Sequence, residues 1–179
     1  MKVFLTLKLW RKSRVASLPK IDMKFNLDFN TAYNQFYVVD KFLYADADTG
    51  CADFWTDYAF DNRLAVSSGV LGIGIESYGH VIGQLEVLSS ENQSVDLNLY
   101  DHVVEGYIEL ESGTLQVLDC PHSAIELETL VQPGPYRVKV YSSNLANTDI
   151  DENEGDDYYK IEIWPGSNKE LKVLKKFIR

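Results

Sequence analysis

The residues best suited to chemistry in this sequence are six carboxylates in the nine-residue stretch DIDENEGDD, positions 149–157. Asp149, Asp151 and Asn153 match three ligand positions of a calcium-binding EF-hand loop. The match then fails, because Glu154 stands where that loop needs glycine and a lysine stands where it needs its last glutamate. The stretch therefore suits three roles: a calcium site of another kind, a contact surface for a positively charged partner, or an ordinary polar hairpin loop.

A second candidate is the thiol–imidazole pair of Cys120 and His122, which are separated by Pro121. The two side chains share one side of a strand only if the proline leaves that strand regular. No CxxC or HxxxH pair completes a zinc set, and no nucleophile elbow, phosphate loop or dinucleotide fingerprint occurs in the sequence. A thiol or metal-dependent hydrolase stays as an alternative, but we expect a protein without catalytic residues and without a cofactor.

Aromatic residues flank several of the loops that carry these groups, among them Trp55, Tyr158 and Tyr159. Tryptophan and tyrosine are frequent anchors of protein interfaces. The plainer interpretation is that most of the aromatic residues fill a core or pair across strands.

The sequence pattern predicts that short strands position the acidic stretch, the Cys120–His122 pair and the aromatic residues. Residues 23–29 alternate apolar and polar side chains, which is the pattern of a half-buried strand. Residues 54–64 are the best helix candidate, with Thr56 or Asp57 as its cap. Other strand candidates recur roughly every eight to twelve residues, at 33–39, 70–75, 81–88, 95–99, 103–111, 114–118, 125–130, 136–141 and 158–164, and residues 171–178 suit a last strand or a short basic helix. This pattern predicts an all-β fold, a single-domain antiparallel β-sandwich with one short helix near residues 54–64.

Charge is distributed unevenly along the chain, whose net charge is −10. Residues 21–166 hold 26 acidic and 6 basic residues, whereas residues 1–20 hold six basic residues and no acidic one. We therefore divide the chain into a basic N-terminal extension (1–22), an acidic sandwich domain (23–166) and a basic C-terminal segment (167–179). Such an acidic domain repels nucleic acid, because phosphates bind Lys and Arg, and attracts a basic protein or metal cations.

Two cysteines, Cys51 and Cys120, are too few for a disulfide framework, and Lys8 interrupts the short apolar run near the N-terminus. No stretch approaches the roughly 20 apolar residues that span a membrane. We expect a cytoplasmic protein with reduced thiols. Membrane contact would be indirect or made through the basic N-terminal arm.

Several segments, taken in their order along the chain, carry a family resemblance. They are Gln35-Phe36-Tyr37-Val38 with Asp40, Phe54-Trp55-Thr56-Asp57, Ser68-Gly69-Val70-Leu71, the strand at 103–112, Gln132-Pro133-Gly134-Pro135-Tyr136-Arg137-Val138, and Asp157-Tyr158-Tyr159-Lys160-Ile161. Together they resemble the competence protein J family (ComJ, also called Nin). The resemblance covers residues 25–164, and its most specific parts are the WTD segment and the last two strands.

The resemblance implies a non-enzymatic inhibitor of the immunity or antidote type, which binds a nuclease or a nuclease toxin. The charge pattern agrees, because a polyanion could occupy the basic DNA-binding cleft of such a partner. The predicted partner-binding residues are Asp149, Asp151, Glu152, Glu154, Asp156, Asp157, Trp55, Tyr158 and Tyr159. The alternative is a calcium- or ligand-binding β-sandwich module, which calorimetric titration with calcium would distinguish.

Overall fold

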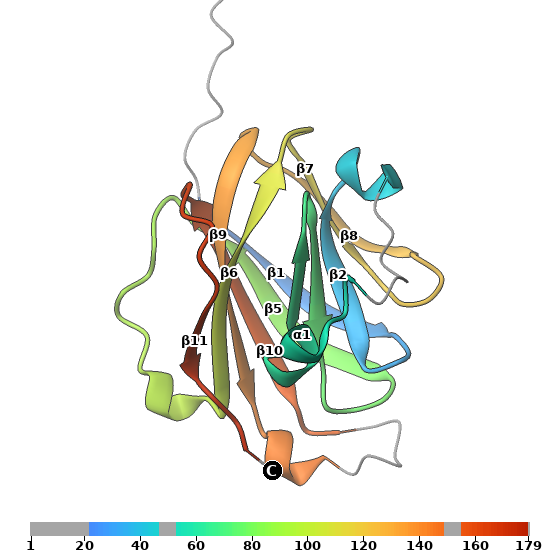
Figure 1. Cartoon of the computed structure of the whole chain (residues 1–179), viewed down its shortest axis with the longest axis vertical. Coiled ribbons are helices and arrows are strands. Elements are labelled where there is room, and N and C mark those ends of the chain that lie inside the picture. The colour runs from blue at the N-terminus through green and yellow to red at the C-terminus, as the bar shows by residue number, and fades with distance from the viewer. Residues whose placement is uncertain (1–21, 47–52, 149–154, 179) are drawn as a thin grey trace, which may run out of the picture.

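Two β-sheets pack face to face in this protein, whose computed structural model describes residues 22–46, 53–148 and 155–178 (Figure 1). Sheet A has the strand order β1 (Met23–Asn30), β5 (His80–Val87), β10 (Tyr158–Pro165), β9 (Gly134–Ser143), β6 (His102–Leu110) and β11 (Lys172–Lys175). Sheet B has the order β3 (Leu64–Ser67), β4 (Val70–Gly74), β2 (Gln35–Asp40), β7 (Thr114–Leu118) and β8 (Ile125–Leu130). The other elements are the helix α1 (Asp57–Asp61) and the 3-10 turns η1 (Leu43–Asp46), η2 (Leu97–Leu99) and η3 (Leu145–Asn147). The predicted all-β sandwich with one short helix is confirmed.

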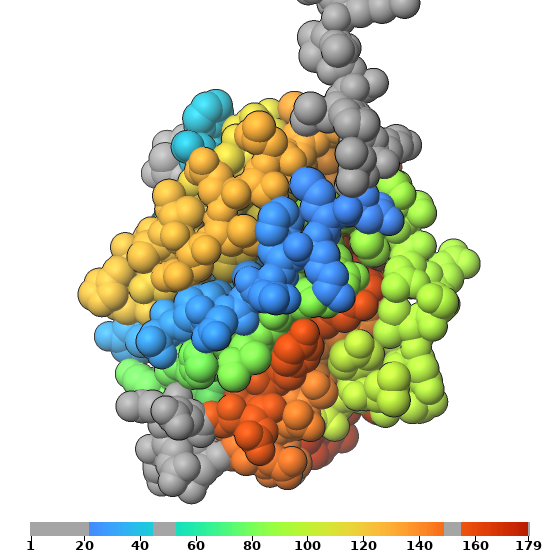
Figure 2. Space-filling model, turned by 180° about the vertical axis from the view of Figure 1, so that it is seen from behind, coloured from blue at the N-terminus to red at the C-terminus, as the bar shows by residue number. Residues whose placement is uncertain are grey.

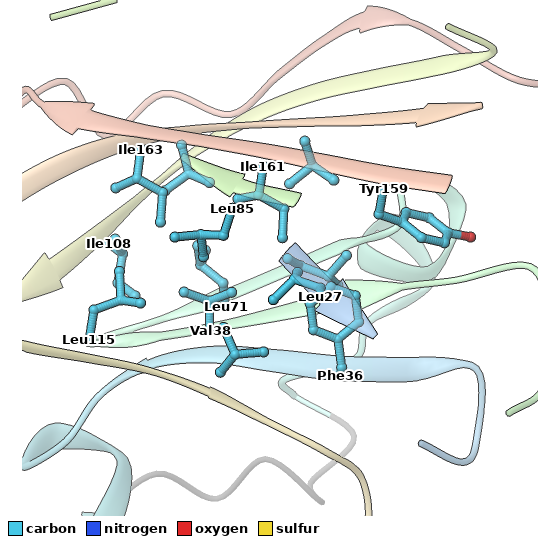
Figure 3. Close-up of a cluster of buried hydrophobic side chains, with 14 of the residues drawn as sticks. Leu27, Phe36, Val38, Leu71, Leu85, Ile108, Leu115, Tyr159, Ile161 and Ile163 are labelled. Atoms are coloured by element: carbon cyan, nitrogen blue, oxygen red, sulfur yellow. The ribbon is translucent and has the colours of Figure 1, made fainter. Parts of the chain in front are cut away.

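The main core lies between the two sheets and explains the period-two pattern of the sequence. Leu27, Leu85 and Ile161 point inward from sheet A, and Val38 and Leu71 meet them from sheet B (Figure 3). Each fully buried side chain of this size contributes about 1.5–3 kcal/mol. Alternate residues on the same strands face outward, so the register of each strand is fixed by the core.

One strand pair departs from the antiparallel expectation. Strand β10 runs parallel to β5, with Tyr158 opposite Ile82 and Ile163 opposite Val87. The other pairings between the named strands are antiparallel. A parallel pair needs a crossover rather than a hairpin, and here a long stretch of the chain lies between the two strands.

The outer face of sheet A is polar, and residues 88–101 (Figure 2, yellow-green) contact its strands β9 and β10, where Lys139, Tyr141 and Glu162 are buried. Glu162 is fully buried and accepts hydrogen bonds from the Tyr141 hydroxyl at 2.7 Å and from Lys160 Nζ at 2.7 Å. Asn92 of the crossing segment donates to the same carboxylate at 3.1 Å. The buried charge is therefore paired and hydrogen-bonded, as a buried charge requires.

One predicted strand is wrong, and the predicted helix is present but shorter than expected. Residues 95–99, expected to be a strand, form the turn η2 within the crossing segment. The Asp96 side chain accepts the Asn98 N–H at 2.9 Å, a local bond that competes with strand pairing. The helix candidate ends early at Asn62, because Arg63 takes a positive φ of 55° and strand β3 follows.

The C-terminal segment is partly built into sheet A. Strand β11 pairs with β6, so the strand alternative for residues 171–178 is confirmed. Buried Arg137 donates to the carbonyls of Asn168 and Glu170, both at 2.7 Å, and so fixes the backbone before β11. The proposed N-terminal extension lies outside the described residues except for Asp22.

Candidate protein-binding surface

Four of the predicted contact residues, Asp149, Asp151, Glu152 and Glu154, lie outside the described residues. Asp156, at the end of the acidic stretch, is exposed to solvent. Its carbonyl accepts a hydrogen bond from Asn144 Nδ2 at 3.0 Å. This bond ties the backbone at the end of the acidic stretch to the end of β9.

Asp157 is buried, with only 1% of its surface exposed. Its Oδ2 accepts hydrogen bonds from the Ser77 N–H at 3.0 Å, the Ser77 hydroxyl at 3.1 Å, the Glu76 N–H at 3.3 Å and the Tyr159 hydroxyl at 2.6 Å. Its Oδ1 is also buried and has no hydrogen-bond partner in the part of the chain that the structure describes. Asp157 therefore anchors the start of β10 to the β4–β5 turn and does not present its carboxylate to a partner.

Tyr159 is fully buried as well, at the end of the main core, with its hydroxyl directed away from the aliphatic side chains (Figure 3). The hydroxyl also accepts the Glu76 N–H at 2.7 Å. Burial, followed by the negative charge of Asp157, raises the pKa of Tyr159 well above its usual value. Tyr159 and Asp157 thus form an internal hydrogen-bonded unit, whereas the intervening Tyr158 is partly exposed on the other face of the strand.

Trp55 lies just before α1, on the outer face of sheet B. Thr56 caps the helix, because its hydroxyl accepts the Ala59 N–H at 3.2 Å. The indole ring packs against Gly72 of β4, where an added Cβ atom would lie 2.6 Å from Trp55 Cζ2 and 2.9 Å from Phe54 Cε1. Indole Nε1 is buried and has no acceptor among the described residues. Glycine at position 72 is therefore favoured by the close approach of the two rings.

A row of ring contacts extends from this point. The ring centroids of Tyr37 and Phe54 are 6.3 Å apart, those of Phe54 and Trp55 are 5.8 Å apart, and Phe60 stacks on Trp55 at 5.1 Å and 28°. The inner end of the row belongs to a second, smaller core, which also contains Ala59. The outer end reaches solvent, because Phe60 is 60% exposed.

The exposed surface of α1 combines aromatic and acidic side chains. We call this set the α1 patch; it consists of Trp55, Asp57, Tyr58, Phe60 and Asp61. Tyr58 is 56% exposed, and both carboxylates are exposed. Asp61 lies 3.7 Å from Lys176, and Asp57 makes no ion pair within the described residues.

The α1 patch and the acidic stretch are connected through the interior. Arg63, directly after α1, forms an ion pair with Glu76. The backbone N–H of Glu76 in turn donates to Asp157 at the start of β10. Helix α1 and the start of β10 both lie in the lower half of Figure 1.

The thiol–imidazole pair does not assemble. Cys120 is buried beside Gln35 Nε2 at 3.3 Å and the Tyr37 hydroxyl at 4.0 Å, whereas His122 is exposed. Within residues 22–46, 53–148 and 155–178, no group of three or more His, Cys, Asp or Glu residues could hold a metal ion. No helix in the same ranges is long and apolar enough to cross a membrane.

Sequence reasoning did not select Tyr58 and Phe60 as contact residues. The reason is the length of the helix, which the sequence predicts as residues 54–64 and which is only Asp57–Asp61 in the structure. A five-residue helix makes little more than one turn and buries one narrow stripe, which here is Ala59. The residues on either side of that alanine must then point away from the core.

The fold is shared with two solved structures. ComJ from Bacillus subtilis, described as an inhibitor of the DNA degrading activity of NucA, superposes with a TM-score of 0.60. The match covers 80% of this chain and 98% of ComJ at 18% sequence identity. The product of crocagin biosynthetic gene J superposes with a TM-score of 0.54, over 82% of this chain and 99% of that chain, at 19% identity. At these identities the likeness shows a common fold, and the expected structural resemblance to ComJ is confirmed.

No family profile and no curated protein sequence matches the chain.

Proposed function

We propose that this protein is a non-enzymatic inhibitor that binds a nuclease and covers its basic DNA-binding cleft. The observation that carries the proposal is the common fold with ComJ, which inhibits the DNA degrading activity of NucA, over nearly the whole of ComJ. A protein that acts in this way needs a surface complementary to a DNA-binding cleft rather than catalytic residues of its own.

The charge of the sandwich domain supports the same proposal. With 26 acidic and 6 basic residues between positions 21 and 166, the domain has a formal net charge of 6 − 26 = −20 and so a negative field. Such a field steers a basic partner toward the protein and repels nucleic acid. A nuclease has the positive groove that this field would attract, because it must hold the phosphate backbone.

The acidic stretch remains a proposed contact, but its members differ in role. Asp156 is exposed and available, together with the partly exposed Tyr158. Asp157 and Tyr159 act from the interior by holding the start of β10 in place. Asp149, Asp151, Glu152 and Glu154 complete the proposed acidic contact.

The direct test is inhibition of DNA degradation. Two nucleases serve as probes: NucA of Bacillus subtilis, and the nuclease whose gene lies nearest to the gene of this protein. We expect a near-stoichiometric amount of the protein to block at least one of them. If both degrade DNA at an unchanged rate in the presence of a hundredfold excess, the proposal is wrong.

A charge-matched pair of variants then tests the acidic stretch. The first variant changes Asp149, Asp151, Glu152, Glu154 and Asp156 to the corresponding amides. The control changes five exposed carboxylates elsewhere, Asp28, Asp96, Glu111, Glu126 and Glu128. We expect the first to weaken inhibition about tenfold or more and the control to have a clearly smaller effect. Equal losses of inhibition in both variants would show that inhibition depends on the total charge and not on contacts of this stretch.

A further inference from the structure

We infer that the α1 patch is the anchor of the interface, where arginine or lysine side chains of the inhibited nuclease lie over Tyr58 and Phe60 and pair with Asp57 and Asp61. This inference rests on the proposed function and names the surface that carries most of the binding energy.

Burial of Ala59 does not require large aromatic side chains at positions 58 and 60. Tyr58 and Phe60 are each more than half exposed, although Ala59 between them is buried in the second core. Smaller polar residues at both positions would leave the packing of Ala59 intact. The two rings are two positions apart on α1, so they flank the exposed carboxylates of Asp57 and Asp61 rather than touch each other. Exposed aromatic side chains of this kind are typical of interface anchors.

The Phe60 side of the patch is also packed before a partner arrives. Phe60 stacks on Trp55, and Trp55 is wedged against Gly72 and Phe54. The row of rings continues to Tyr37 in sheet B. A preformed surface loses little conformational entropy on binding, so a larger share of the contact energy appears as affinity.

The carboxylates determine the chemistry of the partner. Asp57 has no ion pair within the described residues, and Asp61 has only a long, exposed contact with Lys176. An arginine guanidinium can stack on an aromatic ring and pair with a carboxylate at the same time, and lysine can do so as a point charge. The patch therefore fits the Lys- and Arg-rich face of a protein and would repel a nucleic acid backbone.

The position of the patch agrees with this role. Through Arg63, Glu76 and Asp157 it is joined to the start of β10 and to exposed Asp156. One partner could thus contact both the α1 patch and exposed Asp156. The arrangement places aromatic residues beside a carboxylate-rich rim, which is the usual anatomy of an interface.

The test uses the full chain and the nuclease that the unaltered protein inhibits. In the first variant, Tyr58→Ala with Phe60→Ala, we expect about a 30-fold or greater loss of affinity, mainly as faster dissociation. In the second, Asp57→Asn with Asp61→Asn, we expect mainly slower association at low salt. The single change Tyr58→Arg, which removes no ring contact of the fold, should also weaken binding by placing a positive charge against a basic face.

The matched control removes one exposed apolar side chain and one exposed carboxylate from the opposite face, by Leu99→Ala with Asp96→Asn. These residues belong to the crossing segment, which is seen from behind in Figure 2. The control should bind like the unaltered chain, and urea unfolding should show that every variant is folded. If folded Tyr58→Ala/Phe60→Ala and Tyr58→Arg variants bind within threefold of the unaltered chain, this inference is wrong and the proposed function stands. If the unaltered chain inhibits neither nuclease, both are wrong.

Discussion

Neighbouring acidic residues in this protein have opposite roles. Asp156 is exposed, whereas Asp157 is buried and receives four hydrogen bonds on one oxygen. Hydrogen bonds to a charged acceptor contribute more than bonds between neutral groups, and losing them in the interior is costly. Counting carboxylates in a stretch therefore says little about which of them a partner can contact.

The change Asp157→Asn should lower the free energy of unfolding by about 2 kcal/mol, because it removes the charge from four buried hydrogen bonds. The adjacent change Asp156→Asn should alter it by less than about 0.5 kcal/mol, as expected for an exposed residue. Urea denaturation followed by circular dichroism would measure both. Equal effects of the two changes would contradict the internal role of Asp157.

His102 connects the end of α1 to the C-terminal segment. Its Nε2–H donates to the Asn62 carbonyl at 3.1 Å, and its Nδ1 accepts the Phe177 N–H at 3.3 Å, so the ring must be neutral. Burial lowers the pKa of His102 below its usual value; the bond to Asn62 opposes this shift, and the charges of Arg63 and Lys176 add to it. A proton on Nδ1 would break the bond to Phe177.

This arrangement makes stability depend on pH. The folded-state pKa of His102 is lower than its unfolded value of about 6.5. Above that pH the ring is neutral in both states. As the pH falls below it, the unfolded chain binds a proton that the folded chain does not, and the free energy of unfolding decreases until the folded pKa is reached.

We therefore expect urea midpoints to fall as the pH is lowered below about 6.5. The variant His102→Gln should show a smaller decrease over this range, while the exposed-site change His122→Gln should leave the decrease unchanged. An identical pH dependence in the unaltered protein and in His102→Gln would show that His102 does not cause the decrease in stability.

At the scale of elements, close approach between backbone segments determines where strands pack. Gly83 of β5 lies opposite Tyr159 of β10, and a Cβ atom at position 83 would be 2.2 Å from the Tyr159 carbonyl oxygen. At Gly72 the obstacles are instead the side-chain rings of Trp55 and Phe54. Rings can shift, whereas a backbone carbonyl in the middle of a sheet cannot.

The two substitutions should differ accordingly. We expect Gly83→Ala to lower the free energy of unfolding by about 3 kcal/mol and Gly72→Ala by about 1–2 kcal/mol, since overpacking costs more where nothing can move. Gly72→Ala should also change tryptophan fluorescence, because Trp55 must be displaced. Denaturant unfolding of both variants is the measurement, and a smaller loss for Gly83→Ala would contradict the parallel pairing of β5 and β10.

At the scale of the whole molecule, the negative field should control how fast a partner arrives. The rate constant for association with the inhibited nuclease should fall about tenfold or more as salt is raised from about 0.05 to 0.5 M, because salt screens exposed charges. A chain without residues 1–20 lacks six positive charges and should depend on salt more steeply. Stopped-flow measurements at several salt concentrations would test this, and a rate that is insensitive to salt would contradict electrostatic steering.

Much of the fold was predictable because single strands are local patterns. The alternation in residues 23–29 can be read from neighbours in the chain, and strand β1 was found there. Sheet order was not predictable in this way, because the partners in β5 and β10 are more than 70 residues apart. Local rules also missed β3, a four-residue strand directly after the helix.

The candidate surface was predictable only in part, for a similar reason. Composition located the acidic stretch and Trp55. It could not show that Asp157 and Tyr159 would be buried, because the groups that bind them belong to Glu76 and Ser77 on a distant turn. Burial depends on the distant partner, which one segment of sequence does not contain.

Sheet A cannot form in the order in which a ribosome makes the chain. All strands of sheet B end by Leu130, so that sheet is complete early in synthesis. Strand β10, which lies between β5 and β9, ends only at Pro165 of the 179 residues. While the exit tunnel still encloses β10, the β1–β5 pair exposes an open edge that can pair wrongly with other chains. Sheet A can therefore reach its native strand order only after β10 has left the tunnel.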